Sequence, residues 1–181
     1  MRQKFTRDFR EDYYHGLKGV YFFRILEAII KIGDLRKRNV KVLDFGCGTG
    51  RLKELLPGKV IGYDISPELT EIKDWKKAKF DVVVSNEVFY LFSREGLIRL
   101  LGEIYKVNPN AELIVGISRQ GIINKILSVL AGEGDAHDDT KLSPSEEIKT
   151  LKQKMDVIKK KTVFFMCDVY LLKFRDRGKD E

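Results

Sequence analysis

A buried strand that runs directly into a glycine-rich loop constrains this chain more than any other feature. Residues 40–45 form a mostly apolar run, and the loop that follows contains Gly46, Gly48 and Gly50. Because glycine lacks a Cβ and readily adopts positive φ, such a loop can expose its N–H groups and let a bulky ligand approach closely. The pattern predicts the first strand, loop and helix of an α/β fold, with a ligand bound at the loop.

The spacing of the glycines separates two kinds of cofactor loop. The dinucleotide-binding fingerprint G-x-G-x-x-G requires glycine where this chain has Arg51, which disfavours a nicotinamide-dependent dehydrogenase. Residues 44–50 instead have the spacing D-x-G-x-G-x-G. This spacing resembles the first motif of the class I (Rossmann-like) methyltransferases, and the chain looks like their small-molecule type. The resemblance implies S-adenosylmethionine (SAM) as the cofactor and S-adenosylhomocysteine (SAH) as the product.

Length and composition favour a single domain. The chain has 181 residues, of which 43% are hydrophobic and 34% charged, and no apolar run approaches the roughly 20 residues of a membrane span. The N-terminus lacks the apolar core of a signal peptide, and two cysteines cannot form a disulfide framework. We therefore expect one SAM-binding domain over residues 1–181, located in the cytoplasm. Neither His15 nor His137 has metal-ligand spacing, so no metal site is expected.

The excess of positive charge is concentrated near the N-terminus. Residues 1–41 contain 11 lysines and arginines against 5 acidic residues, which accounts for +6 of the total net charge of +7. We expect residues 1–38 to form a basic helical leader. It could attract an anionic substrate, nucleic acid or an acidic membrane surface, or it could be an ordinary solvated helix face.

Strand and helix patterns alternate along the chain. Strands are predicted at 40–45, 60–64, 80–85 and 111–117, and helices at 20–35, 51–56 and from Ser93 to residue 107. This alternation predicts a doubly wound, mostly parallel sheet. Predicted strands at 157–165 and 169–174 form a closing hairpin, which resembles the C-terminal antiparallel strand of class I methyltransferases. Residues 118–155 are expected to be a helical insertion on the substrate side, with helices at 121–131 and 143–154.

The chain departs from the family pattern after the second predicted strand. Only residues 66–79 separate it from the strand that starts at residue 80, whereas the family usually has a helix and a third strand there. One of these two elements must be reduced here, which could leave a short third strand around residues 70–73.

The resemblance gives roles to residues at the carboxyl ends of the first two strands, where ligands bind in open α/β sheets. The glycine loop, including Cys47, would pass the methionine part of SAM. Asp44 would accept the charged ammonium of SAM, or it could cap the following helix. Asp64 follows 20 residues later and would accept the ribose hydroxyls.

The adenine side and the end of the next strand complete the expected cofactor site. Ile65 would line the adenine pocket, and Asp74 would accept the adenine amino group. Trp75 could pack on the adenine ring or belong to the core. Asn86 lies where the family places residues that flank the SAM methyl group.

Four residues are candidates for the acceptor side of the pocket. Glu87 and Tyr90 follow the strand at 80–85, and Glu87 could bind the substrate or the SAM ammonium, or cap the next turn. Tyr14 belongs to the leader, which closes over the cofactor in related folds; packing is its alternative role. His137 resembles a residue of substrate-covering loops and could act as the catalytic base, or it could be an exposed loop histidine.

These features predict a SAM-dependent methyltransferase that acts on a small acceptor, which could be anionic. Residues 85–90 contain no proline pair of the kind common in methyltransferases of nucleobase amines, so nucleic acid is not favoured. Two alternatives stay open. The chain could methylate RNA or protein through its basic leader, or it could be a catalytically silent SAM-binding module that works through a partner.

Overall fold

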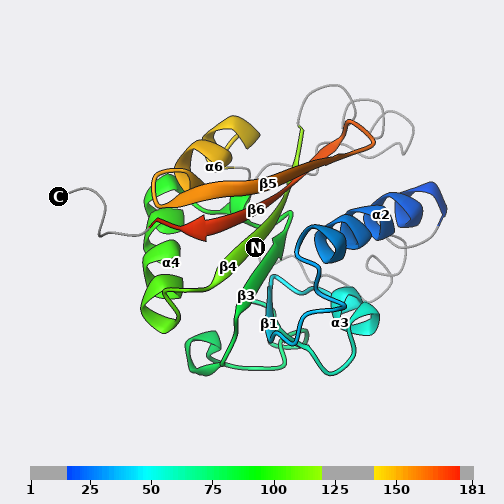
Figure 1. Ribbon diagram of the computed structural model, residues 1–181, viewed down its shortest axis with the longest axis horizontal. Helices are drawn as coiled ribbons and strands as arrows, with labels where there is room; N and C mark the ends of the chain where they lie inside the picture. Colours follow the sequence, from blue (N-terminus) through cyan, green and yellow to red (C-terminus); the bar gives the residue numbers. More distant parts are fainter. Residues whose placement is uncertain (1–15, 120–140, 176–181) are drawn as a thin grey trace, which may run out of the picture.

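The computed structural model describes residues 16–119 and 141–175, which form one six-stranded sheet with helices on both faces (Figure 1). The strand order is β2-β1-β3-β4-β6-β5. The parallel part comprises β1 (Val42–Phe45), β2 (Val60–Tyr63), β3 (Val82–Asn86) and β4 (Glu112–Ser118). The last two strands, β5 (Met155–Val163) and β6 (Cys167–Phe174), are antiparallel to each other, and β6 is antiparallel to β4. The predicted α/β fold with an antiparallel C-terminal strand is confirmed.

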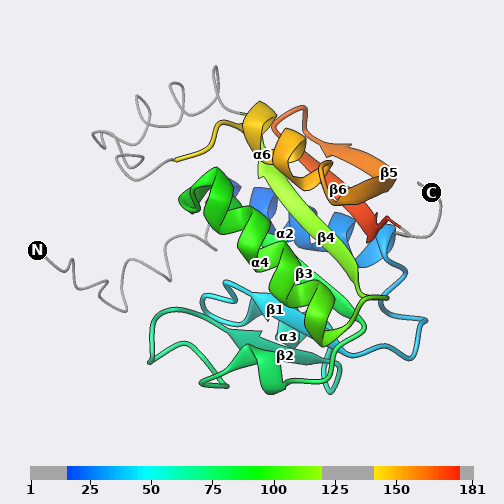
Figure 2. The same cartoon turned by 90° about the vertical axis from the view of Figure 1, so that its left-hand side faces the viewer.

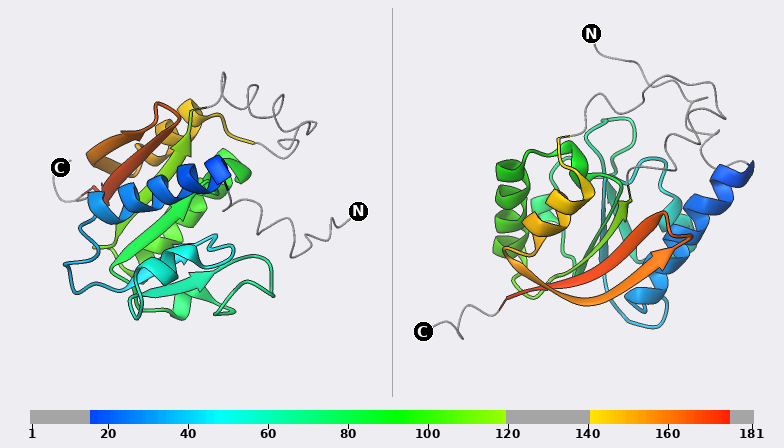
Figure 3. Two further views of the ribbon diagram at one scale, coloured as in Figure 1. Left: turned by 90° about the vertical axis from the view of Figure 1, so that its right-hand side faces the viewer. Right: turned by 90° about the horizontal axis from the view of Figure 1, so that it is seen from above.

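The sheet separates two apolar cores. Helix α2 (Gly16–Ile32) and helix α3 (Arg51–Leu55) cover one face, and α4 (Arg94–Val107) and α6 (Pro144–Leu151) cover the other (Figures 2 and 3). Side chains of β3 alternate between the two cores, so that Val83 belongs to the α4 side and Val84 to the α2 side. The β-branched run of β3 is buried on both faces, as expected of a central parallel strand.

Local sequence signals set the ends of the helices on the α4 side. The Ser93 hydroxyl accepts a hydrogen bond from the Gly96 N–H and caps α4. Helix α6 starts with a capping box in which Ser143 and Glu146 satisfy each other's backbone N–H groups, and Pro144 occupies the first turn. Helix α6 ends at Leu151, three residues earlier than predicted, because the chain turns into β5 at Met155.

The predicted third strand at 70–73 is wrong. Residues 66–79 form turns and the short 3-10 helix η1 (Trp75–Lys77), and a single backbone hydrogen bond, from Glu71 N to Gly62 O, joins them to β2. The segment must return from the carboxyl end of β2 to the start of β3, which leaves too few residues for a helix and a strand. Strand β2 is therefore the edge of the sheet.

The C-terminal hairpin lies where the sequence predicts it, but the residues of its turn give no turn signal in the sequence. Phe164 and Phe165 both adopt positive φ, at 49° and 58°, between β5 and β6. Non-glycine residues seldom adopt this conformation, so the usual turn signals are missing. The predicted helix at 121–131 and residues 1–15 of the predicted leader lie outside the described residues, whereas α2 belongs to the described part of the leader.

Candidate cofactor and acceptor site

The glycine loop leaves the carboxyl end of β1 in a conformation that requires glycine. Gly46, Gly48 and Gly50 have φ values of 83°, 51° and 81°. The N–H groups of Gly46 and Cys47 both donate to the Tyr63 carbonyl, which fixes the loop against β2. A Cβ on Gly46 would clash with the Val88 side chain, whereas a Cβ on Gly48 or Gly50 would meet no atom within 4 Å. The loop is thus packed on one side and open on the other.

Asp64 connects the loop to the end of β2. Its Oδ2 accepts a hydrogen bond of 3.0 Å from Gly48 N, and its Oδ1 accepts one of 3.0 Å from Ser66 N. Because β1 and β2 are parallel neighbours, their carboxyl ends meet and bring Asp44 and Asp64 to one edge. The two acids predicted from the sequence therefore lie at the same end of the sheet as the glycine loop, and Asp64 binds the loop directly.

Asp44 is buried at 6% exposure, and its environment favours the neutral carboxyl group. Burial, followed by the charges of Asp64 and Glu71, raises the pKa of Asp44 to about 7. The same causes, with the Asp44 charge added, raise the pKa of the Cys47 thiol to about 12, so this cysteine is a neutral thiol rather than a nucleophile. A bound cation would relieve the repulsion among these acids, which suits the ammonium and sulfonium groups of SAM.

The residues predicted for the adenine side have different surroundings. Ile65 is 90% exposed next to Asp64 and offers a free apolar side chain. Asp74 caps η1 by accepting a hydrogen bond from Lys76 N. Trp75 is buried and packs edge-on against Phe45, with ring centroids 5.8 Å apart. The tryptophan thus lies in the core beneath this part of the site.

Asn86 is the last residue of β3, and Glu87 follows it. Asn86 Oδ1 is buried without a hydrogen-bond partner in the described chain, and it lies where a side chain at Gly116 would project. Glu87 has a positive φ of 57°, and its Oε1 accepts a hydrogen bond of 2.6 Å from the Ser118 hydroxyl. Burial raises the pKa of Glu87 to about 7.

Sequence reasoning gave no role to Glu147, a second buried acid, which lies on α6. Glu147 belongs to α6, is 4% exposed, and has its pKa raised to about 8 by burial and by the charge of Glu87. Its burial could have been found from helical periodicity, because Glu147 stands three and four residues before the buried Thr150 and Leu151.

The other predicted acceptor residues are placed only in part. The Tyr90 carbonyl accepts hydrogen bonds from the N–H groups of Lys141 and Leu142, which ties the residues before α6 to the turn that follows β3. Tyr14 and His137 lie outside the described residues. Among residues 16–119 and 141–175, no group of histidines, cysteines and acids is arranged to hold a metal ion.

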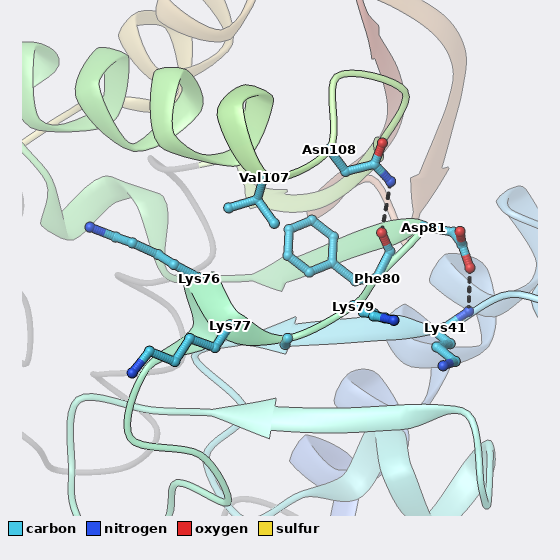
Figure 4. A pocket seen from close by; sticks show the side chains of 9 residues that line it. Lys41, Lys76, Lys77, Lys79, Phe80, Asp81, Val107 and Asn108 are labelled. Atoms are coloured by element: carbon cyan, nitrogen blue, oxygen red, sulfur yellow. Dashed lines mark hydrogen bonds between the residues drawn. The ribbon is translucent and has the colours of Figure 1, made fainter.

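A separate cavity of about 530 Å³ lies at the opposite end of the parallel strands from the glycine loop (Figure 4). It is lined by Lys41, which precedes β1, by Phe80 and Asp81, which precede β3, and by Asn108 between α4 and β4. Strand direction therefore places it at the amino ends of the strands. The glycine loop is at the carboxyl ends, so this cavity is not part of the cofactor site.

Comparison with known proteins agrees with the geometry of the glycine loop and its acids. A family model described as "Methyltransferase domain" matches residues 18–122, which is more than half of the chain. The chain belongs to this methyltransferase family. No curated protein matches this methyltransferase closely enough to count as a relative.

Solved structures share the fold of this methyltransferase at low sequence identity. The PH0226 protein from Pyrococcus horikoshii OT3 has a TM-score of 0.67 and 16% identity, with 95% of this chain and all of that chain covered. Magnesium protoporphyrin IX methyltransferase from Synechocystis PCC 6803, with bound SAH, has a TM-score of 0.65 and 16% identity over 93% of each chain. The N-methyltransferase NodS from Bradyrhizobium japonicum WM9, with SAH, has a TM-score of 0.62 and 13% identity over 93% of this chain and 98% of that one. The fold is that of the class I SAM-dependent methyltransferases.

Proposed function

We propose that this methyltransferase transfers the methyl group of SAM to a small-molecule acceptor. The observation that carries the proposal is the loop from Gly46 to Gly50, which is open at Gly48 and Gly50, follows Asp44 and is hydrogen-bonded to Asp64. This arrangement combines a backbone surface for close approach with acids that favour a cationic ligand.

Each cofactor residue has a role in this proposal. Cys47 and the loop glycines lie along the methionine part of SAM, and Asp44 binds its ammonium group. Asp64 accepts hydrogen bonds from the ribose hydroxyls and from Gly48 N, which holds the loop. Ile65 and Asp74 bound the adenine side above the buried Trp75. Asn86, with its unpaired Oδ1, flanks the methyl group.

The chemistry needs little from the protein beyond position. Bound SAM supplies an electrophilic methyl group on a positively charged sulfur. The protein orients the acceptor in line with that bond and excludes water, and these effects can supply much of the rate. We propose that Glu87 and Tyr90 contact the acceptor, that Tyr14 closes over it, and that His137 serves as base where the acceptor is a hydroxyl.

A small acceptor is supported by the fold neighbours and by the absence of a proline pair at residues 85–90. The structures with SAH include enzymes named for a porphyrin and for N-methylation. The free thiols of Cys47 and Cys167 favour a reducing cytoplasm. Within the described helices, none has the length and apolar character to cross a membrane.

RNA is the second candidate acceptor. The basic leader and the fold of the small RNA methyltransferase HEN1, at a TM-score of 0.60 and 18% identity, favour it. However, this chain covers only 26% of HEN1. RNA binding that weakens steeply with salt would support this candidate.

The test combines cofactor binding with methyl transfer. Calorimetry should show that SAM binds the wild type and binds Asp64→Asn at least about tenfold more weakly, the effect expected when a charged hydrogen-bond acceptor is lost. Transfer of labelled methyl from SAM to small molecules of a cell extract should then identify the acceptor. SAM binding without transfer to small molecules, RNA or protein would indicate a silent SAM-binding module.

A further inference from the structure

The turn between β5 and β6 holds two phenylalanines in a conformation that is unfavourable for this residue type. Met166 N donates a hydrogen bond of 2.9 Å to Val163 O and closes the turn, and Phe164 and Phe165 between them have φ values of 49° and 58°. Hairpin turns with positive φ at two consecutive residues favour asparagine and glycine, because a Cβ is crowded there. The turn would therefore be more stable with those residues than with phenylalanine.

The two side chains gain little burial in return. Phe164 is 53% and Phe165 84% exposed. Within the described chain neither belongs to an apolar core, whereas Val163 and Cys167, which pair at the base of the turn, are buried in the core on the α2 side. Large apolar side chains that are both strained and exposed are unfavourable for the fold itself. Their presence indicates a contact outside the described fold.

Positive charge lies on both faces of the strand that leads into the turn. Alternation along β5 puts Lys159 and Lys161 on the same face as Val163, and Lys160 on the other face. All three lysines are exposed. Lys160 forms an ion pair of 3.0 Å with Asp168, whereas Lys159 and Lys161 form no ion pair within residues 16–119 and 141–175. Two lysines behind the turn are thus available for an anionic partner.

The turn lies at the end of the sheet that carries the cofactor loop. Cys167 pairs with Ser118, the last residue of β4, so the turn extends beyond the carboxyl end of this parallel strand. The turn also points to the side of the molecule on which α2 begins, where Val20 and Phe23 are two further exposed apolar side chains (Figures 1 and 3). A surface that meets the turn therefore lies at the cofactor end of the sheet.

We propose that the turn at Phe164 and Phe165, with Lys159 and Lys161 behind it, docks the protein on an anionic lipid surface. The phenylalanine rings leave water at the boundary between headgroups and acyl chains, and the lysines attract the anionic headgroups. A strand rises about 3.3 Å per residue, so Lys161 and Lys159 lie about 10 and 17 Å behind Phe164. The nearer lysine is within about one Debye length of a surface that the turn touches. This contact is independent of the proposed methyl transfer.

A second copy of the chain fits this turn less well than a lipid surface. A stable protein interface buries about 800 Å² on each partner, and two phenylalanine side chains supply about 400 Å². In a two-fold contact centred on the turn, the lysines of both copies would also approach one another and repel. A lipid surface needs no complementary shape, and its negative charge matches the lysines.

Vesicle binding by the wild-type chain provides the first test. The protein should co-sediment with vesicles of phosphatidylcholine that contain about 30% phosphatidylserine, and it should bind vesicles of phosphatidylcholine alone at least about tenfold more weakly. Binding to the mixed vesicles should weaken as salt rises, because salt screens the attraction of the lysines. No binding to the mixed vesicles, or equal binding to both kinds, overturns the inference.

Phe164→Asn combined with Phe165→Gly separates the contact from the stability of the turn. These residues suit two consecutive positive φ values, so the Tm should equal or exceed that of the wild type. Affinity for the mixed vesicles should fall at least about tenfold, because two apolar rings are lost. The control is Ile158→Thr, which removes another exposed apolar side chain of β5, about 20 Å from the turn, and should keep wild-type binding. Unchanged binding in the double variant, or an equal loss in the control, contradicts the proposal.

Two charge-matched variants test the lysines. Lys159→Gln with Lys161→Gln should weaken binding to the mixed vesicles about tenfold. Lys152→Gln with Lys154→Gln removes the same charge from exposed positions before β5, at the far end of the hairpin, and should leave affinity within about twofold. Equal losses would mean that the net charge of the chain alone drives binding, which refutes a specific docking surface. Self-association that the phenylalanine variant abolishes, without vesicle binding, would assign the turn to a second copy and overturn the inference.

Discussion

Replacing the loop glycines one at a time with alanine separates the packed side of the loop from its open side. All three glycines have positive φ, which costs an alanine about 1 kcal/mol. At Gly48 nothing lies within 4 Å of the new Cβ, so this is the whole cost. At Gly46 the new Cβ would also clash with Val88 Cγ2 and would lie 3.1 Å from Val88 Cγ1. Overpacking of this kind adds about 2 kcal/mol to the loss of stability.

The difference should be visible in thermal unfolding followed by circular dichroism. A chain of this length loses about 3 °C in Tm per kcal/mol, so Gly48→Ala should lower Tm by about 3 °C and Gly46→Ala by about 9 °C. Val88→Ala removes the atoms with which the Cβ of Gly46→Ala clashes. A double-mutant cycle should therefore give a coupling energy of more than about 1 kcal/mol between the two substitutions.

Cofactor binding should show the opposite order. The Cβ of Gly48→Ala enters the open side, where we propose that SAM binds, so calorimetry should find SAM affinity at least about tenfold lower although the fold is almost unaffected. Equal losses of Tm at Gly46 and Gly48 would refute the account of the packed side. Wild-type SAM affinity in Gly48→Ala would refute the assignment of the open side.

The other predictions concern the acids. Asp64→Ala should lower both SAM affinity and stability, the latter by about 2 kcal/mol, because Gly48 N and Ser66 N lose their acceptor; Asp81→Ala, which frees only Lys41 N, should leave SAM affinity unchanged. The folded state raises the pKa of Asp44 and Glu87 to about 7 and that of Glu147 to about 8. These acids are protonated in both states below pH 4, and ionising them in the folded state becomes unfavourable as pH rises to 8, so the free energy of unfolding falls over this range. The Tm of the cofactor-free protein should therefore fall between pH 5 and 8, Asp44→Asn should flatten the fall, and a rising Tm would contradict it. SAM, whose ammonium favours ionised Asp44, should raise Tm more at pH 8 than at pH 5.5 in scanning fluorimetry.

The order of elements could be predicted because local signals coincide with the fold. The apolar run before the glycine loop, the capping box at Ser143 and the capping serine at 93 each fix an element through neighbouring residues. The reduced third strand was predicted from the family pattern, and this chain is too short between β2 and β3 to follow it. The turn at Phe164 and Phe165 lacks glycine and proline, so no local signal marks it.

The residues of the site also include some that the sequence reveals and others whose position depends on tertiary packing. Asp44 and Asp64 could be found because parallel neighbouring strands bring their carboxyl ends together wherever they lie in the sequence. The position of Glu147 could not be predicted, because it depends on how α6 packs after a long connection from β4. The sequence allows two roles for Trp75, because its burial against Phe45 and Phe80 depends on tertiary packing that no local signal reveals.

The edge position of β2 bears on how this enzyme could be redesigned. Residues 66–79 are tied to β2 by one backbone hydrogen bond, so apart from Trp75 and Ile72, which pack in the core, their sequence can change with little effect on the remaining strands. This is the segment that the family resemblance places beside adenine. Libraries confined to it are therefore a route to variants that accept SAM analogues enlarged on the base, and such analogues with a labelled methyl group would label the products of those variants selectively.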